Sequence, residues 1–112
     1  MLAPPRYSFR HVERSAALEE RVRDLVQRLQ RFDERIDQCH LTVERRPGAG
    51  GGSLPYAVQI DLSIPGAEIH ADGTSGGNSD QAGVFAALKA AFDDAKRQLQ
   101  ELHRERVGTS RR

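Results

Sequence analysis

The chain has 112 residues, of which 38% are apolar and 29% are charged, and its formal net charge is +1. This length and composition favour a single soluble globular domain. No apolar run approaches the roughly 18 residues of a membrane span, and we expect neither a signal peptide nor, with one cysteine, an internal disulfide. So small a net charge excludes wholesale binding to polyanions, and a nucleic-acid role would depend on where the charges lie.

The first predicted elements are a strand and a long amphipathic helix. Tyr7 and Phe9 alternate with polar residues, which predicts a strand over residues 6–12. A helix is predicted from Ser15, its expected N-cap, to between residues 34 and 36. Its apolar stripe consists of Leu18, Val22, Leu25, Val26, Leu29, Phe32 and Ile36. Beside this stripe lie the basic residues Arg21, Arg28, Arg31 and Arg35.

A second strand and a loop follow this helix. The pattern changes from helical to alternating at Asp37, which predicts a strand over residues 38–45. Residues 45–55 are rich in glycine and predict a surface loop that begins with Arg45 and Arg46. No Gly-Lys-Ser/Thr follows, so the loop does not match a phosphate-binding loop.

The next pair of strands is predicted to form a hairpin. Residues 56–64 and residues 67–72 both alternate between apolar and polar side chains. Pro65-Gly66 between them is a typical turn dipeptide, which favours antiparallel pairing. A second loop is predicted over residues 73–79.

The last predicted element is a helix over residues 80–107, with Gly108 as its stop and residues 108–112 as a disordered tail. Its apolar stripe consists of Val84, Leu88, Ala91, Phe92, Ala95, Leu99 and Leu102. We expect its charges to be sorted to two sides. The basic side holds Lys89, Lys96, Arg97, His103 and Arg104, and the acidic side holds Asp94, Glu101 and Glu105.

The element order β-α-β-β-β-α predicts one α+β domain over residues 1–107. Its four-stranded sheet is expected to be largely antiparallel. Both helices are expected to cover the same apolar face of the sheet, which makes the fold a two-layer sandwich.

Residues suited to catalysis or metal binding do not form a recognisable site. Cys39 and His40 are consecutive in a strand, so they point to opposite faces and cannot chelate one ion together. Cys39 is in phase with the apolar positions and is interpreted as a core residue. His40 and His70 are expected to share the solvent face of the sheet with Asp61, but the sequence pattern does not require a further metal ligand beside them. We therefore predict no metal, no cofactor, no small-molecule substrate and no enzymatic activity, because no catalytic or nucleotide-binding motif is present either.

The basic flanks of the two helices are the remaining feature. Such flanks are often only solvated and salt-bridged. However, if both helices pack on one face of the sheet, their basic sides could converge into one stripe suited to phosphates. Because the aromatic side chains are assigned to the core, we expect folded RNA to be recognised through its backbone and shape, without base stacking.

Several segments carry a resemblance to a known family, and they keep the family's order and spacing over nearly the whole chain. The longest of them are LQRFDERI at residues 29–36, YAVQIDLSIPG at residues 56–66 and FAALKAAFDDAKRQL at residues 85–99. With these segments the chain resembles the short ribosome hibernation-promoting factors, also called ribosome-associated translation inhibitors or sigma-factor modulation proteins.

The resemblance implies a β-α-β-β-β-α fold similar to that of double-stranded-RNA-binding domains. It also implies a cytoplasmic, non-enzymatic protein that occupies the decoding channel of the small ribosomal subunit. There it would block the messenger and transfer-RNA sites of idle ribosomes in stationary phase or stress, with no need to oligomerise. Its contacts with rRNA would come from Arg28, Arg35, Lys89, Lys96, Arg97 and Arg104, together with Arg21, Arg31, Arg45 and Arg46. The alternative is a divergent member without ribosome binding, which acts as a protein-interaction module through a sheet edge or the acidic side of the second helix.

Overall fold

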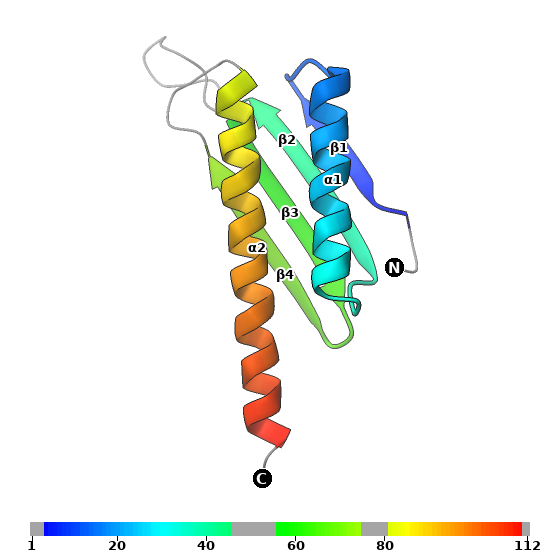
Figure 1. Ribbon diagram of the computed structural model, residues 1–112, viewed down its shortest axis with the longest axis vertical. Helices are drawn as coiled ribbons and strands as arrows, with labels where there is room; N and C mark the ends of the chain where they lie inside the picture. Colours follow the sequence, from blue (N-terminus) through cyan, green and yellow to red (C-terminus); the bar gives the residue numbers. More distant parts are fainter. Residues whose placement is uncertain (1–3, 46–55, 75–80, 111–112) are drawn as a thin grey trace.

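The computed structural model describes residues 4–45, 56–74 and 81–110, without the side chains of residues 81–82 and 105–110. Within these residues lie β1 (Arg6–Arg10), α1 (Ala16–Phe32), β2 (Gln38–Arg45), β3 (Tyr56–Ile64), β4 (Ala67–Thr74) and α2 (Gln81–Ser110). The strands form one sheet in the order β1-β2-β3-β4, and both helices cover the same face of it (Figure 1). The predicted α+β two-layer sandwich is therefore confirmed. Neither helix, as far as it is described, is long and apolar enough to cross a bilayer.

The sheet is mixed because its connections differ. α1 links β1 to β2 as a crossover, and these two strands are parallel. The remaining pairs, β2 with β3 and β3 with β4, are antiparallel. The predicted hairpin is confirmed, and Gly66 in its turn has a φ of 83°, a left-handed conformation that glycine adopts without strain.

Two predicted boundaries in the first half of the chain are wrong. β1 ends at Arg10, before residue 12, because His11 takes a φ of 58° that breaks the extended backbone. Ser15 caps α1 as predicted, with its hydroxyl oxygen accepting the Leu18 N–H at 3.1 Å. α1 ends at Phe32, before residues 34–36, because the Asp33 carboxylate accepts the Arg35 backbone N–H at 3.0 Å and replaces a helical hydrogen bond.

The hydrophobic core lies between the sheet and the two helices. The largest side chains that are less than 2% exposed come from both layers, and they are Leu29, Ile36, Leu41, Ile60, Leu62, Leu88, Leu99, Val22, Val26, Val43 and Val58. Cys39 lies among them, as predicted. Burial, with a further contribution from the charge of Asp61, raises the pKa of the Cys39 thiol to about 12. Since the thiolate is the reactive form, the cysteine is not a nucleophile at neutral pH.

α2 lies very close to β4 at Gly73. A Cβ atom on Gly73 would lie 2.5 Å from the Ala87 carbonyl oxygen and closer still to the Ala91 amide nitrogen. The sequence predicts that Gly73 begins a loop, but β4 continues to Thr74 and buries this glycine under α2. The missing side chain is what allows the helix backbone to rest on the strand.

α2 also extends beyond its predicted end. The expected stop at Gly108 is wrong, because the helix continues to Ser110, and residues 111–112 lie outside the described residues. A glycine inside a helix costs only about 1 kcal/mol relative to alanine, so it need not end the helix. The last turns of α2 project past the end of the sheet (Figure 1).

Candidate nucleic-acid interface

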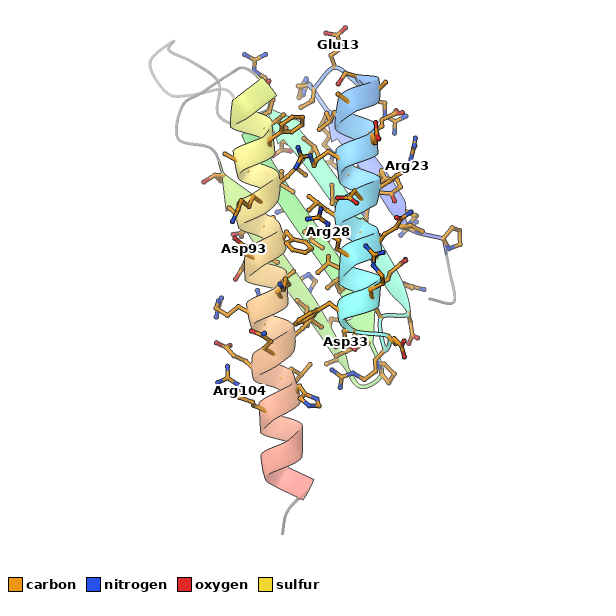
Figure 2. The ribbon with its side chains drawn as sticks, viewed as in Figure 1. Glu13, Arg23, Arg28, Asp33, Asp93 and Arg104 are labelled. Carbon is orange, nitrogen blue, oxygen red and sulfur yellow. The ribbon has the colours of Figure 1, made fainter. Side chains whose placement is uncertain are left out.

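The basic flanks of the two helices face each other. Arg21 and Arg28 are seven residues apart on α1 and so share a side, and the Arg21 guanidinium lies 4.7 Å from the ring centroid of Phe85 on α2. Lys89 and Lys96 share a side of α2 in the same way, and the Lys96 ammonium lies 5.1 Å from the ring centroid of Phe32 on α1. We call this surface the interhelix groove and define it by Arg21, Arg28, Phe32, Phe85, Lys89 and Lys96. Figure 2 shows Arg28 pointing toward α2, whereas Arg23 points away from it.

Some of these cations carry a local counter-charge. Arg28 Nε lies 3.1 Å from Asp24 Oδ2, and Lys89 Nζ lies 2.9 Å from Asp93 Oδ2. Both pairs are exposed and four residues apart, so each contributes only about 0.3–0.5 kcal/mol and yields easily to a competing phosphate. Within the described part of the chain, no carboxylate pairs with Arg21 or Lys96, which contact aromatic rings instead.

A pocket of about 820 Å³ at the end of α1 shares Phe32 with the interhelix groove, and we call it the Phe32 pocket. It is lined by Arg31, Phe32, Asp33, Glu34, Arg35, Leu99, Gln100, His103 and Arg104. Arg35 donates to Asp33 through Nε at 2.9 Å and Nη2 at 2.7 Å, and these hydrogen bonds lower the pKa of the Asp33 carboxyl. The sequence assigns Phe32 to the core, but this is wrong. Its side chain is 40% exposed because the chain turns away directly after it.

Arg97 lies on the other flank of α2. It donates to Asp94 Oδ1 at 2.5 Å and to Glu101 Oε1 at 3.0 Å. The predicted separation of Arg97 from these two acids is therefore wrong, since residues three or four apart on a helix are neighbours. Asp94 also accepts the backbone N–H of Asp72 at 3.2 Å, so this flank covers the free edge of β4 and faces away from α1.

Part of the surface that an interaction module would use, the β4 edge, is thus engaged within the domain. In addition to the Asp94 contact, Gln98 Nε2 donates to the His70 carbonyl oxygen of β4 at 2.9 Å. Main-chain groups at the edge of a sheet are otherwise available to pair with another strand. Side chains of α2 occupy two of these groups on β4.

Arg45 lies at the opposite end of the groove from the Phe32 pocket. Arg45, the last residue of β2, lies with Ser15 and Val84 around a pocket at the start of both helices. Its guanidinium is 5.5 Å from the ring centroid of Tyr56, and its Nε is buried without a hydrogen-bond partner among the described residues. Arg46 lies outside the described residues.

The open face of the sheet carries the two histidines that the sequence placed there. The strand register aligns His40 with Asp61 and Asp61 with His70. His40 Nε2 and the Ser8 hydroxyl are hydrogen-bonded at 2.8 Å. His70 Nδ1 donates to Asp61 Oδ1 at 2.7 Å. The described residues contain no group of three or more potential ligands placed to hold a metal ion.

We expect His70 to titrate above its ordinary pKa of 6.5, because the hydrogen bond to Asp61 and the charges of Asp61 and Glu68 favour the imidazolium. A raised folded-state pKa stabilises the fold below pH 6.5, and that contribution is lost as the pH rises through the folded-state value. Histidine ring NMR signals followed against pH would measure the midpoint. Asp61→Asn should lower the midpoint of His70. The control variant Asp93→Asn removes a carboxylate from the helical layer and should leave the midpoint unchanged. A midpoint at or below 6.5 in the unmodified chain would contradict the Asp61 contact.

Comparison with known proteins adds a family and a fold. Residues 6–107 match the family model described as sigma 54 modulation protein / S30EA ribosomal protein. No curated protein matches the chain. The similar solved structures include a ribosomal subunit interface protein from Coxiella burnetii, which is 18% identical and has a TM-score of 0.69 over 88% of this chain and 96% of that one. They also include the N-terminal domain of Thermus thermophilus Protein Y, which is 18% identical and has a TM-score of 0.64 over 87% of this chain and 94% of that one. At this level of identity they show that the fold is shared.

Proposed function

The chain belongs to the sigma 54 modulation protein / S30EA ribosomal protein family, and on this premise we propose that it binds the small ribosomal subunit through its interhelix groove. In this proposal the domain occupies the decoding channel and excludes messenger and transfer RNA, which holds idle ribosomes inactive. The effect is steric and requires no catalytic group. A ribosome-bound protein of this kind would act in the cytoplasm, under starvation or stress.

The observation that carries the proposal is the meeting of four cations in one groove. Arg21 of α1 and Lys96 of α2 each contact an aromatic ring of the other helix, and Arg28 points toward α2 (Figure 2). Lys89 lies seven residues before Lys96 and so shares its side of α2. Residues seven apart on a helix are about 10 Å apart along its axis, so each pair can reach different phosphates. The net charge of the whole chain is only +1, but its positive charges are concentrated on this surface.

The groove is extended at its far end by the cations of the Phe32 pocket, Arg31, Arg35 and Arg104. We include these residues in the proposed rRNA-binding surface. Arg45 lies at the other end and would contact rRNA only if the RNA followed the groove over its full length. Arg97 faces away from α1, and we expect its contribution to be small for a domain that binds through one face.

Co-sedimentation with purified small subunits across a salt series tests the proposal. Each phosphate contact adds roughly 0.7–0.9 to the slope of log K against log salt, so contacts by the four groove cations predict a slope of about 3. We expect pelleting at low salt and steep release as the salt concentration rises, with no pelleting on large subunits as the control. A chain that stays in the supernatant at low salt would contradict small-subunit binding.

A further inference from the structure

Phe32 combines exposure with an unusual position. It is the only large hydrophobic side chain that is exposed among the described residues, at 40%, while Leu29 one turn earlier is completely buried. An exposed apolar side chain alone indicates nothing, since such residues are common on protein surfaces. Phe32 is distinguished by its place inside the basic surface, where it joins the interhelix groove to the Phe32 pocket.

Cations surround this ring. The Lys96 ammonium lies 5.1 Å from its centroid, and Arg31, Arg35 and Arg104 line the pocket beside it. Only two carboxylates line the same pocket, and Asp33 already accepts two side-chain hydrogen bonds from Arg35. The surroundings of the ring are therefore net positive even with His103 neutral.

An aromatic face among cations matches the chemistry of one nucleotide. An unpaired base offers a flat π surface for stacking, and its flanking phosphates offer anions. A paired base inside a duplex is already stacked and does not offer its face. An apolar protein segment would suit the ring but would leave the surrounding cations without partners, so the observations favour RNA.

We propose that Phe32 stacks on an unpaired base of the bound RNA, while Arg31, Arg35 and Arg104 contact the phosphates next to that base. The inference rests on the proposed function and adds a single-stranded target to it. It also revises the expectation that recognition uses only backbone and shape. That expectation followed from assigning most of the aromatic rings, Phe32 among them, to the core, and the exposure of Phe32 contradicts its assignment.

Paired variants separate stacking from charge. Phe32→Leu should lower affinity for purified small subunits about 5- to 150-fold, the range for losing one base–aromatic stack. The slope of log K against log salt should stay unchanged, since stacking releases no counterions. Phe32→Tyr keeps a ring and should bind like the unmodified chain. Arg31→Gln should reduce the slope instead, and Phe9→Leu, a ring lost from β1, should change neither quantity.

Fluorescence gives a second, independent readout. The chain contains no tryptophan, so Phe32→Trp introduces a unique probe. We expect a single-stranded oligoadenylate to quench this tryptophan, and neither an RNA duplex of equal length nor polyphosphate to do so. Quenching by polyphosphate or by the duplex as strongly as by the single strand would overturn the inference.

Failure of the inference and failure of the proposed function look different. If the unmodified chain binds small subunits and Phe32→Leu binds equally well, stacking is refuted while the proposed function stands. If the unmodified chain does not bind, the proposed function fails, and the tryptophan titration still decides whether the pocket takes an unpaired base. Selective capture of a protein by the unmodified chain over Phe32→Leu, without quenching by RNA, would refute the inference in favour of a protein ligand.

Discussion

Reversing two charges in the interhelix groove, with Arg28→Glu and Lys96→Glu together, should weaken small-subunit binding roughly 100- to 10,000-fold. The two residues come from different helices and face the same groove, so each glutamate would meet the phosphate that its cation had contacted. Placing like charges together costs several kcal/mol, and each 1.4 kcal/mol is a tenfold loss of affinity. Co-sedimentation at low salt measures the loss.

The matched control reverses the same number of charges elsewhere. Arg10→Glu with Arg97→Glu changes the net charge equally, but Arg10 is exposed on β1 and Arg97 lies on the β4 flank of α2. We expect this variant to bind within a few fold of the unmodified chain. Circular dichroism should show both variants folded. Equal losses in the two double variants would mean that total charge, and not the groove, governs binding.

Replacing Gly73 with valine should lower the free energy of unfolding by about 3 kcal/mol or more. The new Cβ would lie 2.5 Å from the Ala87 carbonyl oxygen, and backbone atoms of a helix cannot move aside as a flexible side chain can. α2 would have to lift from β4. A loss of this size is a large part of the about 5–15 kcal/mol that stabilises a typical domain.

Urea unfolding followed by circular dichroism at the helix band would measure the effect. Thr74→Val provides the control, because the neighbouring side chain is exposed and valine suits a strand. We expect Thr74→Val to unfold at nearly the same urea concentration as the unmodified chain. An unchanged midpoint for Gly73→Val would show that α2 does not rest on β4 as closely as described.

The two results together would separate folding from binding. Gly73 lies under α2 at Ala87 and Ala91, close in sequence to Lys89 of the groove. The groove variants should lose binding and keep their stability, since the altered side chains lie on the helix surfaces. The Gly73 variant should lose stability first. A groove variant that unfolds would show that these charges also hold the helices together.

Local sequence patterns were sufficient to predict the elements of the fold. A change of period from helical to alternating at Asp37 marked the passage from α1 to β2, and Pro65-Gly66 marked the hairpin. Such patterns depend on neighbours within one or two turns, so they can be read from the chain directly. The burial of Cys39 and the placement of His40, Asp61 and His70 on the open face followed from the same alternation.

The site was predictable only in part. Spacing along each helix correctly grouped Arg21 with Arg28 and Lys89 with Lys96, because residues seven apart share a side. It misplaced Arg97, whose neighbours Asp94 and Glu101 lie three and four residues away on the flank that covers β4. Which flank of α2 faces α1 and which faces β4 depends on how the helices lie on the sheet.

Phe32 and Gly73 also show what could not be predicted from the sequence. Both look ordinary in the sequence, one as the next member of an apolar stripe and the other as the first residue of a glycine-rich loop. The turn at Asp33 exposes the first, and the close approach of α2 buries the second. A residue's secondary structure follows from its near neighbours in the chain. Its exposure and its partners follow from contacts between segments far apart in the sequence, which exist only once the helices have packed on the sheet.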